Sequence, residues 1–481
     1  MKKRFVSAAL LTVILTSFAS CAGDGTNVDT NVDTGLSEDT VKTVENYPAG
    51  VEPQNYDLTF NILYPNWGLY PNYFFADDEN ASDAMSKALY DREILVEEHL
   101  GVSITNTQVA NHKEVQPAVQ QMVMSGEDTY QLALTHCIRG VSPMLTDGML
   151  LDLENLDMQL DEAWWNTDAL DALRLNGKLY YAISDYMLPD PNCILFNKSL
   201  IEVYDLEDPY ELVRSGEWTL DKMTEMAEVA TTENGDSVWD HNDTYGVTSG
   251  DGWFFSSFIY SSGLGLSEID DEGSIELIFK VDDRSTELME KLDKLFNSGN
   301  SYIYGDDVEP GSVDISSGRC LFNVNTVNQL HTLRDSNVDF GILPYPKLNK
   351  EQTGYFNNDW SGLMCVPSTV KNTEMISDVI ELLSYYSDET VIPAYFDLAL
   401  GNKMTRDDDS KEMLNIIFDN IVFDVGLNYL GFGENMKAYF YAPYFSVIQT
   451  GQNTFASYYA SYEQAALAEI AEFNQAVKEL K

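Results

Sequence analysis

Apolar and polar positions along the chain predict strands that alternate with helices. Residues 58–63 alternate between apolar and polar positions or run apolar, as a strand does, and 82–100 carry apolar residues at helical spacing that end at Gly101. Residues 102–105 and 130–134 are predicted strands, with a helix at about 115–124 between them. Because strands that alternate with helices favour parallel βαβ units, the sequence predicts an α/β fold.

The middle and the end of the chain continue this pattern. Helices are predicted near 209–214, 220–230, 253–261, 285–297, 374–387, 412–420 and 456–481, and strands near 319–324 and 339–343. Trp218, at a helix start, and Trp164 and Trp165, beside a predicted helix, are expected in the core. No repeat of about 20–50 residues is visible, so a solenoid or propeller is not expected.

The first twenty residues have the layout of a secretory signal. Lys2, Lys3 and Arg4 precede a mostly apolar run that is too short for a permanent membrane span, and small residues lead up to Cys21. This arrangement resembles the bacterial lipobox, in which the Cys receives a diacylglycerol. The alternative is an ordinary cleavage site beside an incidental Cys. We expect residues 1–20 to be removed and Cys21 to be lipid-anchored on the outer face of the cell membrane.

Residues 21–55 predict a flexible tether. They are rich in Thr, Asp, Asn, Val and Gly and hold no aromatic residue before Tyr47. A segment of this composition cannot bury enough apolar surface to offset its ordering entropy. The remaining chain, about 425 residues, is long enough for two or three domains.

The charge of the chain is strongly acidic, with 28 Lys and Arg residues against 78 Asp and Glu residues and a net charge of −50. Such a surface repels nucleic acid and anionic lipid headgroups, so neither is an expected partner. The charge predicts a neutral or cationic ligand, although a solvated acidic surface with no bearing on the ligand is the alternative.

The four cysteines after Cys21 form no CxxC pair and match no zinc spacing. They are Cys137, Cys193, Cys320 and Cys365. Apolar neighbours favour buried free thiols, and the exported location leaves disulfides as the alternative.

Five short segments, in the same order along about 400 residues, carry a family resemblance. They are Asn176–Ile183 (NGKLYYAI), Ile194–Lys198 (ILFNK), Gly216–Thr219 (GEWT), Gly341–Lys347 (GILPYPK), and Arg406-Asp407 followed by Met413–Ile417 (MLNII). Together they resemble the family 1 extracellular solute-binding proteins of bacterial ABC importers, in the carbohydrate-uptake branch.

The resemblance implies a two-lobe periplasmic-binding-protein-like fold of type II, whose discontinuous lobes are joined by a hinge of crossing strands. By the same resemblance, lobe 1 comprises residues 56–184 and 323–366, and lobe 2 comprises residues 187–321 and 367–481. It further implies that a monomer captures a carbohydrate, expected to be an oligosaccharide, between the lobes and delivers it to permease subunits without catalysing a reaction.

Candidate ligand-binding residues are those of suitable chemistry in loops at strand ends, where open α/β sheets bind ligands. Aromatic rings stack on the apolar face of a sugar, and polar groups bind its hydroxyls. The candidates are Tyr64, Asn66, Trp67, His136, Arg139, Asp185, Tyr186, Asp251, Trp253, Asn325, Thr326, Asn358, Asp359 and Trp360. By resemblance, the Trp253 position stacks on the sugar, and His136 and Arg139 lie in a ligand-facing loop. For each aromatic residue the alternative is a place in the core, and for Arg139 it is a surface ion pair.

A calcium loop is a local alternative between residues 232 and 243, where oxygen donors recur at the spacing of such loops. The donors are Asn234, Asp236, Asp240 and Asp243. Relatives of the resembled family often carry a fuller acidic motif here, whereas this chain has Thr232 for the first Asp. A solvated polar turn is therefore the other interpretation, and no other cofactor is expected.

Two further function classes stay open. A glycoside hydrolase would need two carboxylates across a cleft. Asp251 and Asp359 are one such pair, but in so acidic a chain the presence of a pair is no evidence for hydrolysis. No G-x-S-x-G, HExxH or P-loop motif occurs. A binding protein for peptides or another small solute is the remaining class, because one scaffold can hold many ligands.

Overall fold

The computed structural model describes residues 47–67, 74–76, 83–250, 252–305, 308, 310–333, 336–400, 407–431 and 433–480. The predicted signal at 1–20, Cys21 and tether residues 22–46 lie outside these ranges. Tyr47–Lys481 form one compact unit. Within the described residues, no helix has both the length and the apolar character that a membrane span requires.

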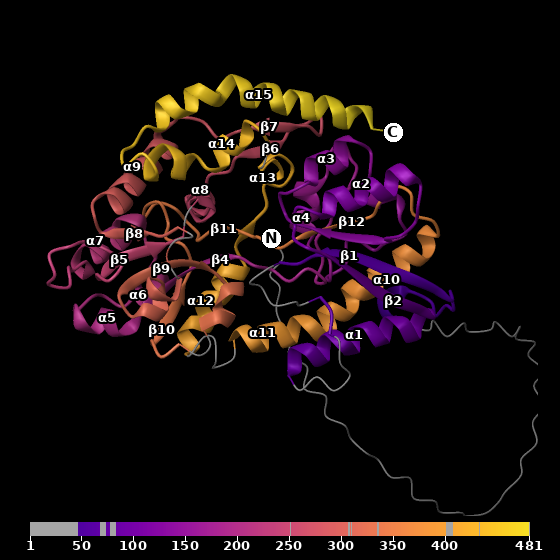
Figure 1. The fold of residues 1–481 in the computed structure, drawn as a ribbon, viewed down its shortest axis with the longest axis horizontal. Helices are drawn as coiled ribbons and strands as arrows, with labels where there is room; N and C mark the ends of the chain where they lie inside the picture. The colour runs from indigo at the N-terminus through magenta and orange to yellow at the C-terminus, as the bar shows by residue number, and fades with distance from the viewer. Residues whose placement is uncertain are drawn as a thin grey trace, which may run out of the picture. The chain divides into compact units, whose positions relative to one another are not determined.

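A four-stranded sheet has the order β12-β3-β1-β2 and lies to the right in Figure 1. Strand β1 (Leu58–Pro65) pairs in parallel with β2 (Val102–Val109) and β3 (Leu132–Thr135), and β12 (Leu363–Cys365) pairs antiparallel to β3. Helices α1 (Ala84–Leu100) and α2 (Val115–Ser125) connect the parallel strands. Both end at a glycine in the left-handed conformation, Gly101 and Gly126. The predicted βαβ units are confirmed.

A five-stranded sheet has the order β10-β4-β9-β5-β8 and lies to the left in Figure 1. Strand β4 (Asn192–Asn197) runs antiparallel to β9 (Cys320–Thr326) and to β10 (Phe340–Leu343). Strand β5 (Tyr245–Ser249) runs parallel to β9 and to β8 (Ser301–Ile303).

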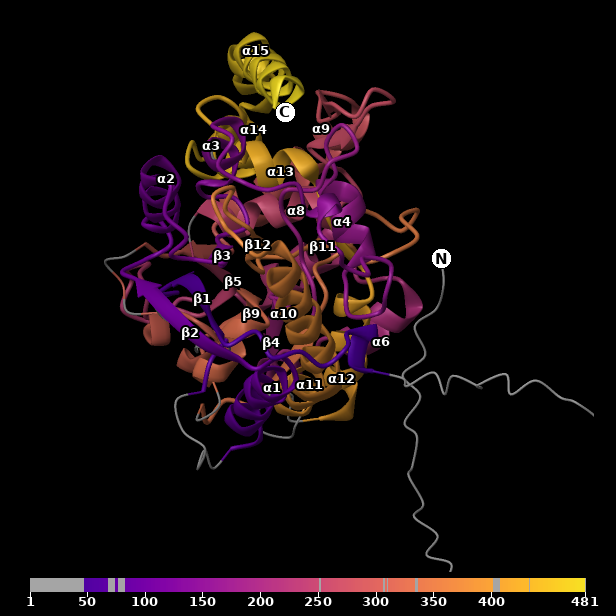
Figure 2. The ribbon, with the colours of Figure 1, turned by 90° about the vertical axis from the view of Figure 1, so that its right-hand side faces the viewer.

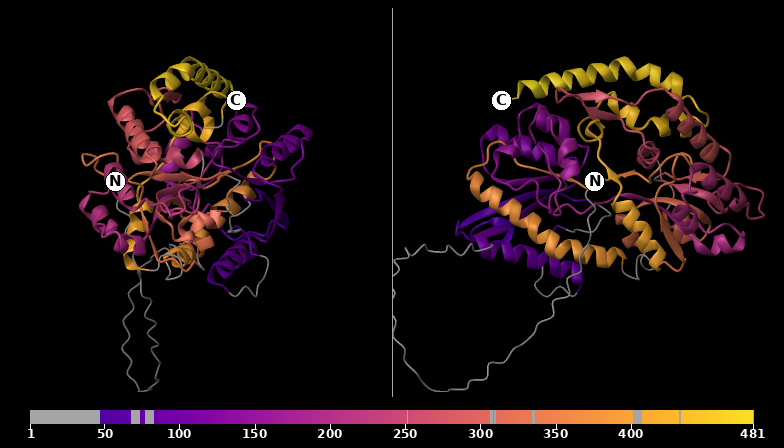
Figure 3. Two further views of the ribbon diagram at one scale, coloured as in Figure 1. Left: turned by 60° about the vertical axis from the view of Figure 1, so that its left-hand side comes forward. Right: turned by 180° about the vertical axis from the view of Figure 1, so that it is seen from behind.

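Two short strand pairs and further helices complete the unit. The pairs are β6 (Ser267–Ile269) with β7 (Ile275–Leu277) and β11 (Asn357–Asn358) with β13 (Ile421–Val422). The helices are α3 (Val141–Thr146), α4 (Thr167–Leu173), α5 (Lys198–Val203), α6 (Pro209–Ser215), α7 (Leu220–Ala230), α8 (Ser257–Ser261), α9 (Asp283–Asn297), α10 (Thr373–Tyr386), α11 (Ile392–Leu400), α12 (Asp408–Phe418), α13 (Val425–Leu430), α14 (Met436–Phe440) and α15 (Phe455–Glu479). Figure 3 shows α15 across one side of the unit, where it packs on both α3 and β7.

Three chain segments meet where the chain passes between the two sheets. The backbone N–H of Trp360 donates to the Asp190 carbonyl at 3.1 Å, and that of Val327 donates to the Pro191 carbonyl at 3.0 Å. The Asn192 amide donates to the Asn358 carbonyl and side-chain oxygen at 3.2 and 3.1 Å. We call these segments, 190–192, 326–328 and 358–361, the crossing.

The two sheets do not follow all of the predicted lobe ranges. Strand β10 lies within 323–366, predicted for lobe 1, yet it pairs with β4 in the five-stranded sheet. Helix α10 lies within 367–481, predicted for lobe 2, yet it packs beside α1, as Figure 2 shows. Glu381 on α10 also accepts from the indole of Trp164 at 2.7 Å. The lobe boundaries themselves stay a prediction.

The predicted core residues are buried. Trp218 is fully buried, and its indole N–H donates to the Pro344 carbonyl at 2.9 Å. Trp164 and Trp165 are buried beside Glu381. The four cysteines after Cys21 are free and buried, which confirms the interpretation as thiols.

Gly341 provides the first testable prediction. It lies on β10 opposite Phe196 of β4, and a Cβ at this position would overlap the Phe196 ring and the Tyr210 hydroxyl. These two rings already pack edge to face at 5.0 Å. We expect Gly341→Ala to lower the free energy of unfolding by about 1–3 kcal/mol, as overpacked cores do.

Urea unfolding would measure this change, with Gly311→Ala as the matched control. Gly311 is exposed, and a Cβ added at this position would have no heavy atom of another segment within 4 Å. The control should stay within about 0.5 kcal/mol of the wild type. Equal losses in both variants would contradict the close packing of β10 on β4.

Candidate ligand-binding site

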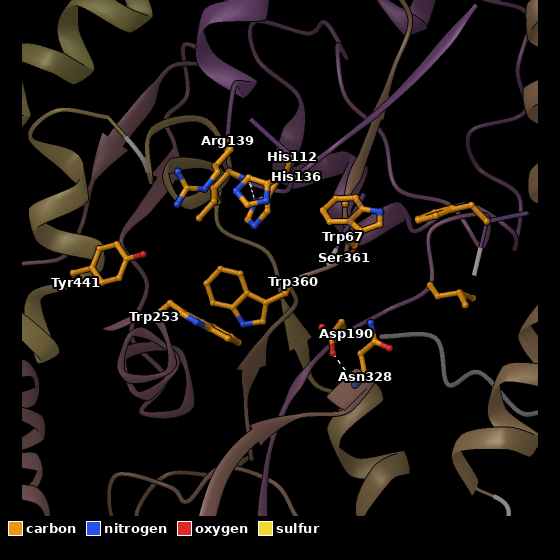
Figure 4. A pocket seen from close by; sticks show the side chains of 14 residues that line it. Trp67, His112, His136, Arg139, Asp190, Trp253, Asn328, Trp360, Ser361 and Tyr441 are labelled. Carbon is orange, nitrogen blue, oxygen red and sulfur yellow. Dashed lines mark hydrogen bonds between the residues drawn. The ribbon is translucent and has the colours of Figure 1, made fainter. Parts of the chain in front are cut away.

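A pocket of about 320 Å³ lies beside the crossing and is shown in Figure 4. Its size is at the small end of the range of about 300–1,000 Å³ for ligand sites. Its lining combines aromatic rings with a similar number of polar side chains. The lining residues are Trp67, Phe74, His112, His136, Ile138, Arg139, Leu188, Asp190, Trp253, Asn328, Trp360, Ser361, Gly362 and Tyr441.

One side of the pocket comes from the carboxyl ends of the parallel strands β1, β2 and β3. Trp67 follows β1, His112 follows β2, and His136 and Arg139 follow β3. Parallel strands bring their carboxyl ends to the same edge of a sheet, which is where open α/β sheets bind ligands. The rings are neighbours, since His136 lies 5.1 Å from His112 and 6.1 Å from Trp67 between centroids.

The opposite side is built from aromatic residues of three other segments. Trp253 lies in the 3₁₀ turn Gly252–Ser256, Trp360 lies in the crossing, and Tyr441 follows α14. The Trp253 ring stacks on Phe254 at 3.8 Å and meets the edge of Trp360 at 5.0 Å and 81°. Figure 4 shows these two indoles at the centre of the pocket.

The crossing fixes the orientation of Trp360. Its indole N–H donates to the Asn192 side-chain oxygen at 3.1 Å, and the Asn192 amide is held in turn by Asn358. Because Asn192 is fully buried, it has little freedom to adopt another orientation. Asn358 therefore contributes to the site through Asn192.

Three buried polar atoms of the lining have no hydrogen-bond partner among the described residues. They are Nε1 of Trp67, Nε2 of His112 and Oδ1 of Asn328. An unpaired buried donor or acceptor costs about 1–3 kcal/mol. A polar ligand that pairs with these atoms would recover that cost on binding.

His136 is held as a neutral ring with a defined tautomer. Its Nδ1 accepts from the backbone N–H of Ile138 at 3.2 Å, so Nε2 carries the proton. Burial, together with the nearby His112 and Arg139, lowers the pKa of His136 to about 3. Burial also lowers the pKa of His112, again with help from Arg139.

Asp190 and Asp359 form a buried carboxylate pair in the crossing. Asp190 accepts from the backbone N–H of Asn328 at 2.9 Å, and Asp359 accepts from the backbone N–H of Asp190 at 2.6 Å. Burial, together with the nearby Asp359 carboxylate, raises the pKa of Asp190 to about 7, although the hydrogen bond from Asn328 acts in the opposite direction. Burial likewise raises the pKa of Asp359.

The structure brings five of the predicted site residues into the pocket: Trp67, His136, Arg139, Trp253 and Trp360. Other predicted residues lie elsewhere. Tyr64 is buried on β1 against Phe75, and Tyr186 is buried with the Arg92 guanidinium 4.5 Å from its ring centroid. Asn66 donates its backbone N–H to Val109, and Asp185 donates its own to Trp164.

The remaining predicted residues support the site or lie outside the described ranges. Asn325 and Thr326 are buried within β9, because that strand continues through Thr326. Asn358 and Asp359 are buried in the crossing and do not line the pocket. Asp251 lies outside the described residues.

Several lining residues were not predicted. His112 obeys the same strand-end rule as His136, but β2 was expected to end near residue 105 and continues to Val109. Asn328 follows β9 in the same way. Asp190 and Tyr441 have no local signal in the sequence, because their positions depend on the crossing and on the packing of α14.

The predicted calcium loop is a turn held by its own side chains. The Asp243 carboxylate accepts from the backbone N–H groups of Asn234 and Asp240 at 2.8 and 2.7 Å. Asp236 accepts from the backbone of Val238 at 2.7 Å. Within the described ranges no three His, Cys, Asp or Glu side chains converge as a metal-binding group, so the calcium interpretation gains no support.

Asp190 provides a prediction on pH dependence. Because its pKa is raised, the folded protein keeps a proton that the unfolded chain loses between pH 3.8 and about 7. Its contribution to stability is therefore full below this window and is lost as the pH rises through it. We expect Asp190→Asn to show a flatter stability profile across this window, since the amide oxygen can still accept from Asn328.

Urea midpoints from about pH 4.5 to about pH 8 would check this profile, with the exposed Asp161→Asn as control. The control should follow the wild type. If Asp190→Asn followed it too, the carboxyl of Asp190 would not titrate in this window.

Comparisons with known proteins bear on the fold. The sequence matches no family model, and it matches no curated protein. The structure resembles the cyclic α-maltosyl-1,6-maltose binding protein from Arthrobacter globiformis with a TM-score of 0.61 and 13% identity, over 86% of this chain and 99% of that one. It resembles a sugar transporter from Rhizobium etli in an open conformation with a TM-score of 0.59 and 12% identity, over 88% and 100%.

A third similar structure is an ABC substrate-binding protein from Listeria monocytogenes in complex with cycloalternan, with a TM-score of 0.54 and 12% identity, over 86% of this chain and 99% of that one. At such low identities the likeness shows the fold alone. The chain has the two-lobe α/β fold of the periplasmic binding proteins.

Proposed function

We propose that this protein is an extracellular, lipid-anchored substrate-binding protein that captures an oligosaccharide between its two lobes and delivers it to an ABC permease. The observation that carries the proposal is the pocket. It combines the indoles of Trp67, Trp253 and Trp360 with buried polar atoms that have no partner among the described residues.

This combination suits a carbohydrate. A sugar ring has an apolar C–H face that stacks on an indole and hydroxyl groups that need hydrogen bonds at the rim. The perpendicular indoles of Trp253 and Trp360 offer two surfaces for such contact. The similar solved structures bind saccharides by their own descriptions, including a cyclic maltosyl-maltose and cycloalternan, which supports the same ligand class here.

The geometry favours capture over hydrolysis. Glycoside hydrolysis uses two carboxyl groups about 5–9.5 Å apart on either side of the bond. Among the described lining residues Asp190 alone is acidic. The Asp359 carboxylate is engaged by the backbone N–H groups of Asp190 and Ser361 at 2.6 and 3.2 Å.

In this proposal, the lipid on Cys21 holds the protein at the outer face of the cell membrane. A single acyl chain holds a protein only marginally, whereas two or more give a lasting anchor. An anchored binding protein stays near its permease, which raises its effective concentration there.

A ligand panel tests the proposed function. Thermal shifts of the full chain would be measured with oligosaccharides and with short peptides, because a ligand that binds only the folded state raises the midpoint. We expect shifts from oligosaccharides. Shifts from peptides alone would favour the peptide-binding alternative, and release of smaller sugars from an oligosaccharide would contradict binding without catalysis.

Trp253→Ala tests the position of the site. Loss of this stacking surface should weaken the affinity for the bound oligosaccharide by about tenfold or more, which corresponds to about 1.4 kcal/mol. Isothermal titration would measure the change. Trp239→Ala is the matched control, because Trp239 is 55% exposed and lies outside the pocket. Unchanged affinity in Trp253→Ala would place the site elsewhere.

Cys21→Ala tests the anchor. Without the thiol that receives the lipid, we expect the protein to move from the membrane fraction to the soluble fraction of expressing cells. Labelling with a palmitate analogue should be lost in the same variant. Cys137→Ala, which removes a buried thiol, should keep both the label and the membrane location.

A further inference from the structure

Four side chains at one end of the pocket form a cluster of hydrogen-bond donors, which we call the donor cluster. They are Trp67, His112, His136 and Arg139. Figure 4 shows the two imidazoles beside Arg139, with Trp67 next to them. Asp190 and Asn328 lie below Trp67 in the same view.

Three of the four side chains present hydrogen-bond donors to the pocket, and the neutral ring of His112 can donate or accept through Nε2. An indole and a guanidinium can only donate, and His136 presents Nε2–H because its Nδ1 already accepts from Ile138 at 3.2 Å. The indole N–H of Trp67 and Nε2 of His112 are buried and have no partner among the described residues. A sugar hydroxyl both donates and accepts, so a site for hydroxyls usually mixes the two kinds of group. A set of donors instead matches a group that only accepts.

The local charge points the same way. Arg139 brings a permanent positive charge to the cluster, and its effect reaches both histidines, whose pKa values it helps to lower. The positive charge is placed here although the whole chain has a net charge of −50. A carboxylate would fit such a site, because it accepts from several donors and pairs with a guanidinium in a planar, charge-assisted contact.

We infer that the donor cluster binds the carboxylate of an acidic sugar, so that the captured saccharide carries a uronate unit at this end of the pocket. The inference rests on the proposed function. The Trp253 and Trp360 rings then contact the remainder of the saccharide.

Paired ligands test this inference. The full chain would be titrated with trisaccharides of galacturonate, glucuronate or mannuronate, each beside the neutral trisaccharide of the same linkage. We expect at least one acidic member to bind about tenfold or more tightly than its neutral counterpart, as hydrogen bonds to charged groups predict. Binding of neutral members alone, or equal binding within every pair, would overturn the inference and leave the proposed function standing. Absence of binding by all members would count against both.

Two variants locate the effect. Arg139→Gln should remove most of the preference for the acidic member over the neutral member of the same pair. Trp67→Phe keeps an aromatic ring without the N–H and should weaken the preference in part. Arg174→Gln is the matched control, since Arg174 pairs with Glu154 and Asp171 outside the pocket, at 2.7 and 2.5 Å. A preference that survives in Arg139→Gln would overturn the assignment to the donor cluster. The comparison of acidic with neutral trisaccharides uses the wild-type protein alone, so it tests the inference even if a variant fails to fold.

Discussion

The site depends on the need to satisfy two buried carboxylates in the crossing. Asp190 and Asp359 are buried there, their raised pKa values favour the neutral form, and backbone N–H groups of other segments donate to them, from Asn328 to Asp190 and from Asp190 to Asp359. These bonds hold together chain segments that are far apart in sequence. The pocket borders the crossing, and Asp190, Asn328 and Trp360 belong to both. A residue outside the pocket lining, Asn358, therefore acts on the site through Asn192 and Trp360.

Around the crossing, the pocket leaves a few polar atoms of the described residues unsatisfied, and on the proposed function these atoms make the site selective. The indole N–H of Trp67 and the amide oxygen of Asn328 are buried without partners among the described residues. A ligand with a matching group removes this penalty, whereas an analogue without the group leaves it in place. Sites built to hydrogen-bond a polar group reject analogues that lack it far more strongly than apolar pockets reject a change of shape. The aromatic rings supply contact area, and the unpaired atoms supply discrimination.

The sequence predicts the part of the site that local rules determine. Alternating strands and helices predicted the parallel sheet, and the rule that ligands bind at carboxyl ends of strands located Trp67, His136 and Arg139. The same rule failed wherever a strand end was misplaced. Strand β1 runs to Pro65 and buries Tyr64, β9 runs to Thr326 and buries Asn325, and β2 runs to Val109, which left His112 unrecognised. Asp190 could not be predicted, because its role arises from contacts with Asn328 and Asp359 that no local pattern records.

The net charge of the chain affects its encounters with large partners, whereas the chemistry of its pocket affects the affinity for a small ligand. Whole-chain charge acts through solvent and is screened over about 8 Å at physiological ionic strength, so it governs encounters with extended polyanions such as nucleic acid. Inside the pocket, affinity depends on the groups that contact the ligand directly. There, Arg139 lies beside two histidines whose pKa values are lowered mainly by burial. A negative surface slows the approach of an anionic ligand but does not set its affinity once the donors are reached. The acidic composition therefore disfavours extended polyanions as partners, whereas on the proposed function the four side chains of the donor cluster set the sign of the ligand's charge.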